Sequence, residues 1–110
     1  MNLKQHLSEL KRKPSIVPVD MTEEWGCTAF VRSLSIGEVR KFQQIYEADS
    51  SEAVLAMVCM GLCEEDGTQI FTFPQDVDSG NLDKFEMKDL GKIVAAINNI
   101  ATAVEHEKKD

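Results

Sequence analysis

AVLAMVCMGLC, at Ala53–Cys63, is the longest apolar run in the chain and decides its fold. It follows Asp49-Ser50-Ser51-Glu52, a spacing typical of the capping box that begins a helix. The run therefore predicts a helix without a polar face, and such a helix lies at the centre of a core or is covered by another subunit. Its eleven residues are fewer than the ~20 that span a bilayer.

Two further main helices are predicted on either side of this run. Ser35-Ile36-Gly37-Glu38 matches a capping box, and apolar residues at helical spacing extend the helix to about Glu47. The last helix is expected to begin near Leu82 or Asp83 and to end at about Glu107. Its apolar residues form a seam with heptad spacing, flanked on one side by Ile93 and Ile100. The seam consists of Leu90, Val94, Ile97, Ala101 and Val104.

β-branched and aromatic residues predict a β-hairpin near the N-terminus, with strands at Ser15–Asp20 and Gly26–Arg32. Because Pro18 cannot donate a backbone hydrogen bond, its strand should lie at an edge of the sheet. A short strand at Thr68–Phe73 is expected between the last two helices, after an Asp-Gly turn. The predicted fold class is therefore α+β and mainly helical, with a hairpin followed by three main helices.

The expected domain organisation is one globular domain with short extensions. A chain of 110 residues has no room for a second core. Residues 1–14 are predicted to be a basic leader, with a helix at Asn2–Lys13 that Asn2 caps and that carries Leu3, Leu7 and Leu10 as a stripe. Residues 15–107 are predicted to form the globular α+β domain, and residues 108–110 a tail.

The charge is negative and unevenly distributed. The net charge is −7, which disfavours nucleic-acid binding through a general basic surface. Residues 1–13 are basic, whereas Phe42–Asp83 contains nine acidic residues and no Lys or Arg. This polarity favours contact with a basic partner. The sequence has no secretory signal, no membrane span and three cysteines, which fits a reducing cytoplasm.

No pattern predicts an enzyme, a metal site or a cofactor. Cys59 and Cys63 share a helix face, but no His or third Cys lies at the spacing of a zinc site, so small core residues are the better interpretation. No cationic residue beside Cys27 would activate its thiol. The acidic turn before Gly67 fails the calcium-loop pattern, because Leu62 and Phe73 occupy positions that require carboxylates.

The order of motifs resembles the tail assembly chaperones of long, non-contractile-tailed, lambda-like phages. The resemblance runs from Val17-Pro18-Val19 through Glu24-Trp25-Gly26 to Ala29–Glu38, and resumes at Cys63–Thr72 with an acidic-Gly turn followed by Ile-Phe-Thr. It spans about Leu3 to Asn98. The chain departs from the family pattern at Cys27, where a small residue is usual, and in a longer final helix.

The resemblance implies a non-enzymatic protein of the infected cell. Such chaperones keep the tape measure protein soluble, help to recruit tail tube proteins and are absent from the mature virion. Many are also made in a longer form by ribosomal frameshifting, and the lysine pair before Asp110 is compatible with a slippery site. The expected partners are therefore the tape measure protein, the tail tube protein, and copies or a longer form of the chain itself, in the host cytoplasm.

Two surfaces are candidate partner-binding sites. The apolar seam, together with Met57, Met60 or Met87, is expected to form either core or a groove for a client helix, because methionine adapts to different partners. The second candidate is the hairpin around Trp25 and Phe30, whose edge strand could pair with another subunit. Two other functions stay open: a generic acidic helical adaptor, and a small redox protein that uses Cys59 and Cys63.

Overall fold

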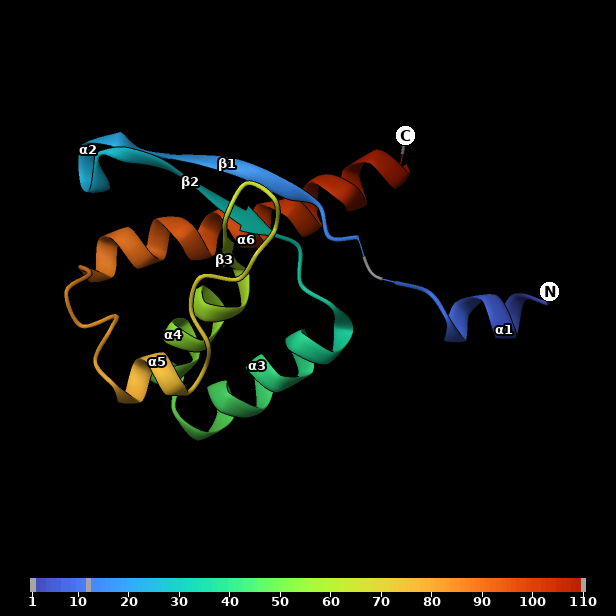
Figure 1. The fold of residues 1–110 in the computed structure, drawn as a ribbon, viewed down its shortest axis with the longest axis horizontal. Coiled ribbons are helices and arrows are strands. Elements are labelled where there is room, and N and C mark those ends of the chain that lie inside the picture. The colour runs from blue at the N-terminus through green and yellow to red at the C-terminus, as the bar shows by residue number, and fades with distance from the viewer. Residues whose placement is uncertain (1, 12, 110) are drawn as a thin grey trace.

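The computed structural model describes the backbone of residues 2–11 and 13–109 and the side chains of residues 2–11 and 13–100. Helices dominate and a small antiparallel sheet lies against them, which confirms the predicted α+β, mainly helical fold class (Figure 1). The elements in chain order are α1 (Leu3–Ser8), β1 (Ile16–Met21), α2 (Thr22–Trp25), β2 (Cys27–Arg32), α3 (Ile36–Ala48), α4 (Ser50–Gly61), β3 (Leu62–Cys63), α5 (Gln75–Asp78) and α6 (Met87–Lys109).

The three strands form an antiparallel sheet in the order β1-β2-β3, with the predicted hairpin as its first two strands. Pro18 lies in the edge strand β1, as its missing N–H predicts. The alternation of a half-buried sheet is visible in β1, where Val19 and Met21 are buried and Asp20 is exposed. One face of the hairpin therefore packs on the helices.

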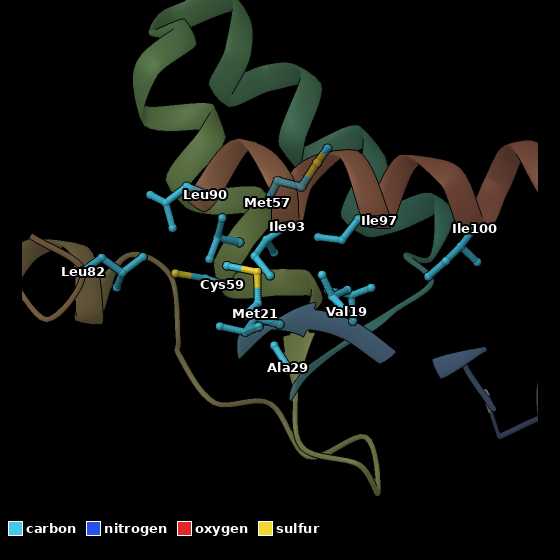
Figure 2. Packing of buried hydrophobic residues seen from close by; sticks show 13 residues of the cluster. Val19, Met21, Ala29, Met57, Cys59, Leu82, Leu90, Ile93, Ile97 and Ile100 are labelled. Carbon is cyan, nitrogen blue, oxygen red and sulfur yellow. The ribbon is translucent and has the colours of Figure 1, made fainter. Parts of the chain in front are cut away.

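The core forms where this face meets α4 and α6 (Figure 2). Helix α4 is buried along most of its length, from Ala53 to Gly61, as expected for a helix without a polar face. Side chains of Ile93 and Ile97 extend from α6 toward Met57 of α4 and toward the sheet (Figure 2). The apolar run thus forms the central helix of this chain's own core.

Ser35 and Asp49 cap α3 and α4 as predicted, but only Ser35 forms a full capping box, because the N–H of Asp49 bonds to the carbonyl of Ile45. Ser35 caps α3 by accepting a hydrogen bond from the N–H of Glu38, and the Glu38 carboxylate accepts one from the N–H of Ser35. Asp49 caps α4 and accepts hydrogen bonds from the N–H groups of Ser51 and Glu52. Both caps satisfy N–H groups that have no partner inside the helix.

The predicted leader helix over Asn2–Lys13 is too long. Asn2 does cap α1 by accepting from the N–H of Gln5, but the helix ends at Ser8. No residue of α1 is buried, and Figure 1 shows α1 apart from the rest of the described chain. Without a packed face, so short a helix has little to stabilise further turns.

Two elements in the second half differ from the prediction. The strand expected at Thr68–Phe73 lies at Leu62–Cys63 instead, and Gln69 forms an isolated bridge with Cys63. The N–H of Thr72 bonds to the side chain of Asp76 rather than to a strand. Helix α6 begins at Met87, because hydrogen-bonded turns occupy the preceding residues.

Candidate partner-binding surface

Helix α3 has an apolar face that the chain leaves largely uncovered. Ile36, Val39, Phe42, Ile45 and Tyr46 follow helical spacing, yet α3 contains no fully buried residue. Ile36 is 76% exposed, and Val39 and Tyr46 are also exposed. Scattered exposed apolar residues are ordinary on a surface, but here they follow one helix face.

This face borders an apolar groove of about 660 Å³ between α3 and α6. Met57 of α4 also lines it, so the groove reaches the core. Most of its lining is apolar, with a few neutral polar side chains. The lining residues are Ser15, Ser33, Leu34, Ile36, Val39, Phe42, Gln43, Met57, Ile97, Asn98 and Ile100. A second hollow of about 370 Å³ shares Phe42 and Gln43 and extends along α3 to Tyr46 and Glu47.

An ion pair fixes the start of α3 against the sheet. Arg32, at the end of β2, is 8% exposed and its guanidinium donates to the Glu38 carboxylate at 2.7 Å. Glu38 also accepts from the backbone N–H of Ser35. One carboxylate therefore joins the strand, the cap and the helix, and sets the orientation of the wall that carries Ile36.

The predicted seam on α6 is divided among different environments. Leu90 and Ile97 are only 2% and 4% exposed and belong to the core, while Val94 is partly buried against it. Ile97 also lines the groove. The side chains of Ala101 and Val104 lie outside the described residues. A partner-binding role for the seam stays a prediction, and in this structure Ile97 is the described seam residue that borders the groove.

The two candidates on the hairpin lie in different places. Trp25, at the end of α2, is partly buried and its ring lies 5.0 Å from that of Phe85, centroid to centroid. Phe30 lies in the central strand β2, opposite Pro18 in the register and away from the face that carries Ala29 and Val31. The structure does not bring Trp25 or Phe30 to the groove.

The methionines proposed as an adaptable surface also separate. Met57 lines the groove, Met60 is buried at 6% exposure, and Met87 is 62% exposed at the first residue of α6. Met57 therefore combines a position in the core with access to the groove. Its flexible thioether side chain can adjust to different neighbours.

The cysteines do not support thiol chemistry. Cys59 is buried, and its burial, with a smaller contribution from Asp76, raises the pKa of the thiol to about 11. Burial likewise raises the pKa of Cys63. A raised pKa lowers the thiolate fraction, which is the reverse of what a reactive cysteine needs.

Across the part of the chain that the structure describes, no group of three metal-ligating side chains is present. No described helix is long and apolar enough to cross a membrane.

Sequence reasoning missed the residues that turn this surface into a groove. Leu34, Ile36, Val39 and Phe42 contribute the α3 side, although their helical spacing was recognisable. Spacing indicates an apolar face but not whether another element covers it. The sequence of α3 did contain a sign that the helix lies at the surface, because Arg40, Lys41 and two glutamines interrupt its apolar residues.

These features define a small, mainly helical α+β protein with an uncovered apolar groove. The family model described as "Phage tail assembly chaperone, TAC" matches residues 1–100, and the chain belongs to this family. The fold is also similar to that of the bacteriophage HK97 tail assembly chaperone, with a TM-score of 0.66 and 14% sequence identity over 86% of this chain and 88% of that chain. The comparison with curated proteins gives no match. The resemblance seen in the sequence is thus confirmed.

Proposed function

We propose that this chaperone keeps a tape measure protein soluble during tail assembly by binding one of its helical segments in the groove between α3 and α6, and that it helps to recruit tail tube subunits. The groove of about 660 Å³ beside the exposed Ile36 and Val39 is the observation that carries the proposal. An amphipathic helix commonly binds by placing its apolar face in such a groove. The role is non-enzymatic, as family membership suggests.

Two properties of the chain suit this role. Met57 in the groove can repack against client side chains of different shapes. The net charge of −7 provides repulsion between complexes and so opposes their aggregation. A chaperone needs both an apolar surface for its client and a charged remainder.

The proposal is tested by co-expressing the chain with the tape measure protein of the same phage and measuring how much of the latter stays soluble. Ile36→Glu should reduce the soluble fraction severalfold, because a carboxylate in an apolar interface loses its hydration without a partner. The change should spare folding, since Ile36 is 76% exposed and an acidic residue suits the first turn of a helix.

Met87→Glu is the matched control. Met87 is 62% exposed, is the first residue of α6 and does not line the groove. It should leave the soluble fraction unchanged. The proposal is wrong if Ile36→Glu protects the tape measure protein as well as the unaltered chain does, or if both variants lose protection equally.

Self-association belongs to the same proposal. Leu3 and Leu7 on α1, and Leu10 just after it, are all more than half exposed and leave an uncovered apolar surface. Leu7→Glu should lower the molar mass of any oligomer measured by light scattering, and an unchanged mass would remove α1 from the contact. A longer form made by frameshifting would extend the chain from the end of α6, and mass spectrometry of infected cells would detect it. Mass spectrometry of purified virions would test the proposed restriction of the chaperone to the host cytoplasm.

The alternative of a generic acidic adaptor predicts a different partner. Such a protein would bind a regulator in a pull-down and would not change the solubility of a tape measure protein. Membership of the tail assembly chaperone family favours the chaperone.

A further inference from the structure

A separate cavity, of about 780 Å³, lies between α2 and the start of α6. Figure 1 shows these two elements close together at the end of the hairpin away from α1. The cavity is lined by two aromatic rings, four carboxylates and two lysines: Trp25, Phe85, Glu23, Glu24, Glu86, Asp89, Lys84 and Lys88. It shares no lining residue with the groove described above.

Two buried polar atoms of the lining residues lack a hydrogen-bond partner. Asp89 is only 7% exposed, and its Oδ1 accepts no hydrogen bond. The Trp25 indole Nε1 is also buried and donates to no acceptor. Buried polar groups are nearly always paired, because an unpaired one has lost its hydration. Both residues line the cavity, so its wall contains one unmatched acceptor and one unmatched donor.

The charge at the cavity favours a cation. Lys92 donates to Glu24 at 2.8 Å, and this hydrogen bond lowers the pKa of the Glu24 carboxyl. Lys88 lies 3.3 Å from Glu86. Among the described residues, Glu23 and Asp89 form no ion pair. The four lining carboxylates outnumber the two lining lysines, Lys84 and Lys88, so the cavity keeps a net negative charge.

The aromatic rings can also hold a cation. The rings of Trp25 and Phe85 lie 5.0 Å apart and are tilted by 41°. The Nζ of Lys84 lies 5.6 Å from the centre of the Phe85 ring, so one cation already lies over this ring. Guanidinium groups stack on tryptophan more readily than ammonium groups do, since they are planar and more weakly hydrated.

We propose that this cavity binds an arginine side chain presented by an extended segment of a protein partner. The guanidinium donates a hydrogen bond to Asp89 Oδ1 and lies against the Trp25 ring. A backbone carbonyl of the same segment accepts from Trp25 Nε1. One occupant thereby pairs both unmatched atoms and meets the negative charge. This proposal rests on the cavity alone. It does not depend on which segment, if any, binds in the groove between α3 and α6.

The single tryptophan provides a direct measurement. In a ¹H–¹⁵N correlation spectrum the indole N–H of Trp25 gives one resonance, which is followed as N-acetyl-arginine N-methylamide is added to the full chain. The resonance should shift and saturate within the millimolar range typical of one anchor residue, about 1 to 10 mM. The N-acetyl-citrulline N-methylamide, which is neutral and nearly isosteric, should give at most a small shift.

Asp89→Asn keeps the shape of the side chain and removes its charge, and it should weaken arginine binding about tenfold. Glu23→Gln, on an exposed side chain, should weaken it about twofold while leaving the fold intact. Asp78→Asn removes the same charge from α5, away from the cavity, and should change nothing. The proposal is overturned if the indole resonance does not shift saturably, if citrulline is as effective as arginine, or if Asp89→Asn and Glu23→Gln both bind as the unaltered chain does.

Discussion

Gly61→Ala is expected to destabilise the chain because α4 and α6 pack closely at this residue, which lies against Ile97. A Cβ at position 61 would collide with Cδ1 of Ile97 and lie 2.8 Å from its Cγ1. Overpacking of this kind costs about 1–3 kcal/mol, and the better helix propensity of alanine offsets up to about 1 kcal/mol of it. The expected net loss in the free energy of unfolding is about 1–2 kcal/mol.

The cause is tested by repeating the change in an Ile97→Val background. Ile97→Val removes Cδ1 and should by itself cost about 0.5–1.5 kcal/mol, since Ile97 is buried. With Cδ1 gone, the penalty of Gly61→Ala should fall by about 1 kcal/mol, which is the coupling expected between residues in direct contact. Urea denaturation of the four chains, followed by circular dichroism, measures this coupling.

Gly91→Ala is the matched control, because Gly91 lies in α6, is exposed, and nothing lies within 4 Å of an added Cβ. It should stabilise the chain by about 0.5–1 kcal/mol through helix propensity alone. The reasoning is refuted if Gly61→Ala costs the same in both backgrounds, or if it stabilises the chain as Gly91→Ala does.

Two further results are expected. Hydrogen bonds from the Ser51 hydroxyl and from backbone N–H groups lower the pKa of Asp49 below its ordinary value of 3.8. The Asp49 carboxylate therefore stabilises the fold above its unfolded-state pKa, and this stabilisation is lost as the pH falls through the lower folded-state pKa. Asp49→Asn removes the titrating group, so the urea midpoint of this variant should fall less between about pH 5 and pH 2 than that of the unaltered chain. Iodoacetamide at about pH 8 should label the exposed Cys27 in the folded chain and label the buried Cys59 and Cys63 only after denaturation, as mass spectrometry would show; rapid native labelling of Cys59 would contradict its burial.

Features that depend on neighbouring residues were predictable. The caps at Ser35 and Asp49 and the edge position of the strand that contains Pro18 were all predicted correctly. Each follows from hydrogen bonds or sterics within a few residues, and local sequence contains this information. The central position of the apolar helix was also predictable, because a helix without a polar face has to be buried.

Features that depend on distant partners were not predictable. Leu62 and Cys63 leave the apolar helix because β2 offers them a strand to pair with, and the helix pattern contains no sign of this. Phe71 and Phe73 alternate as in a strand, yet they pack against the core from a loop. The hydrophobic effect rewards burial in any backbone conformation, so alternation alone did not specify a strand.

The sequence by itself determined a charged, mainly helical α+β protein, and with it the resemblance to the tail assembly chaperones. The tertiary structure decided which apolar residues are covered: Ile97 is buried against Gly61, whereas Ile36 on α3 is open to solvent. It also brought Trp25 and Asp89 to the same cavity between α2 and α6. Helical spacing specifies that an apolar face exists, but whether that face is core or a surface for another protein depends on which elements pack against it, and packing is a property of the whole fold.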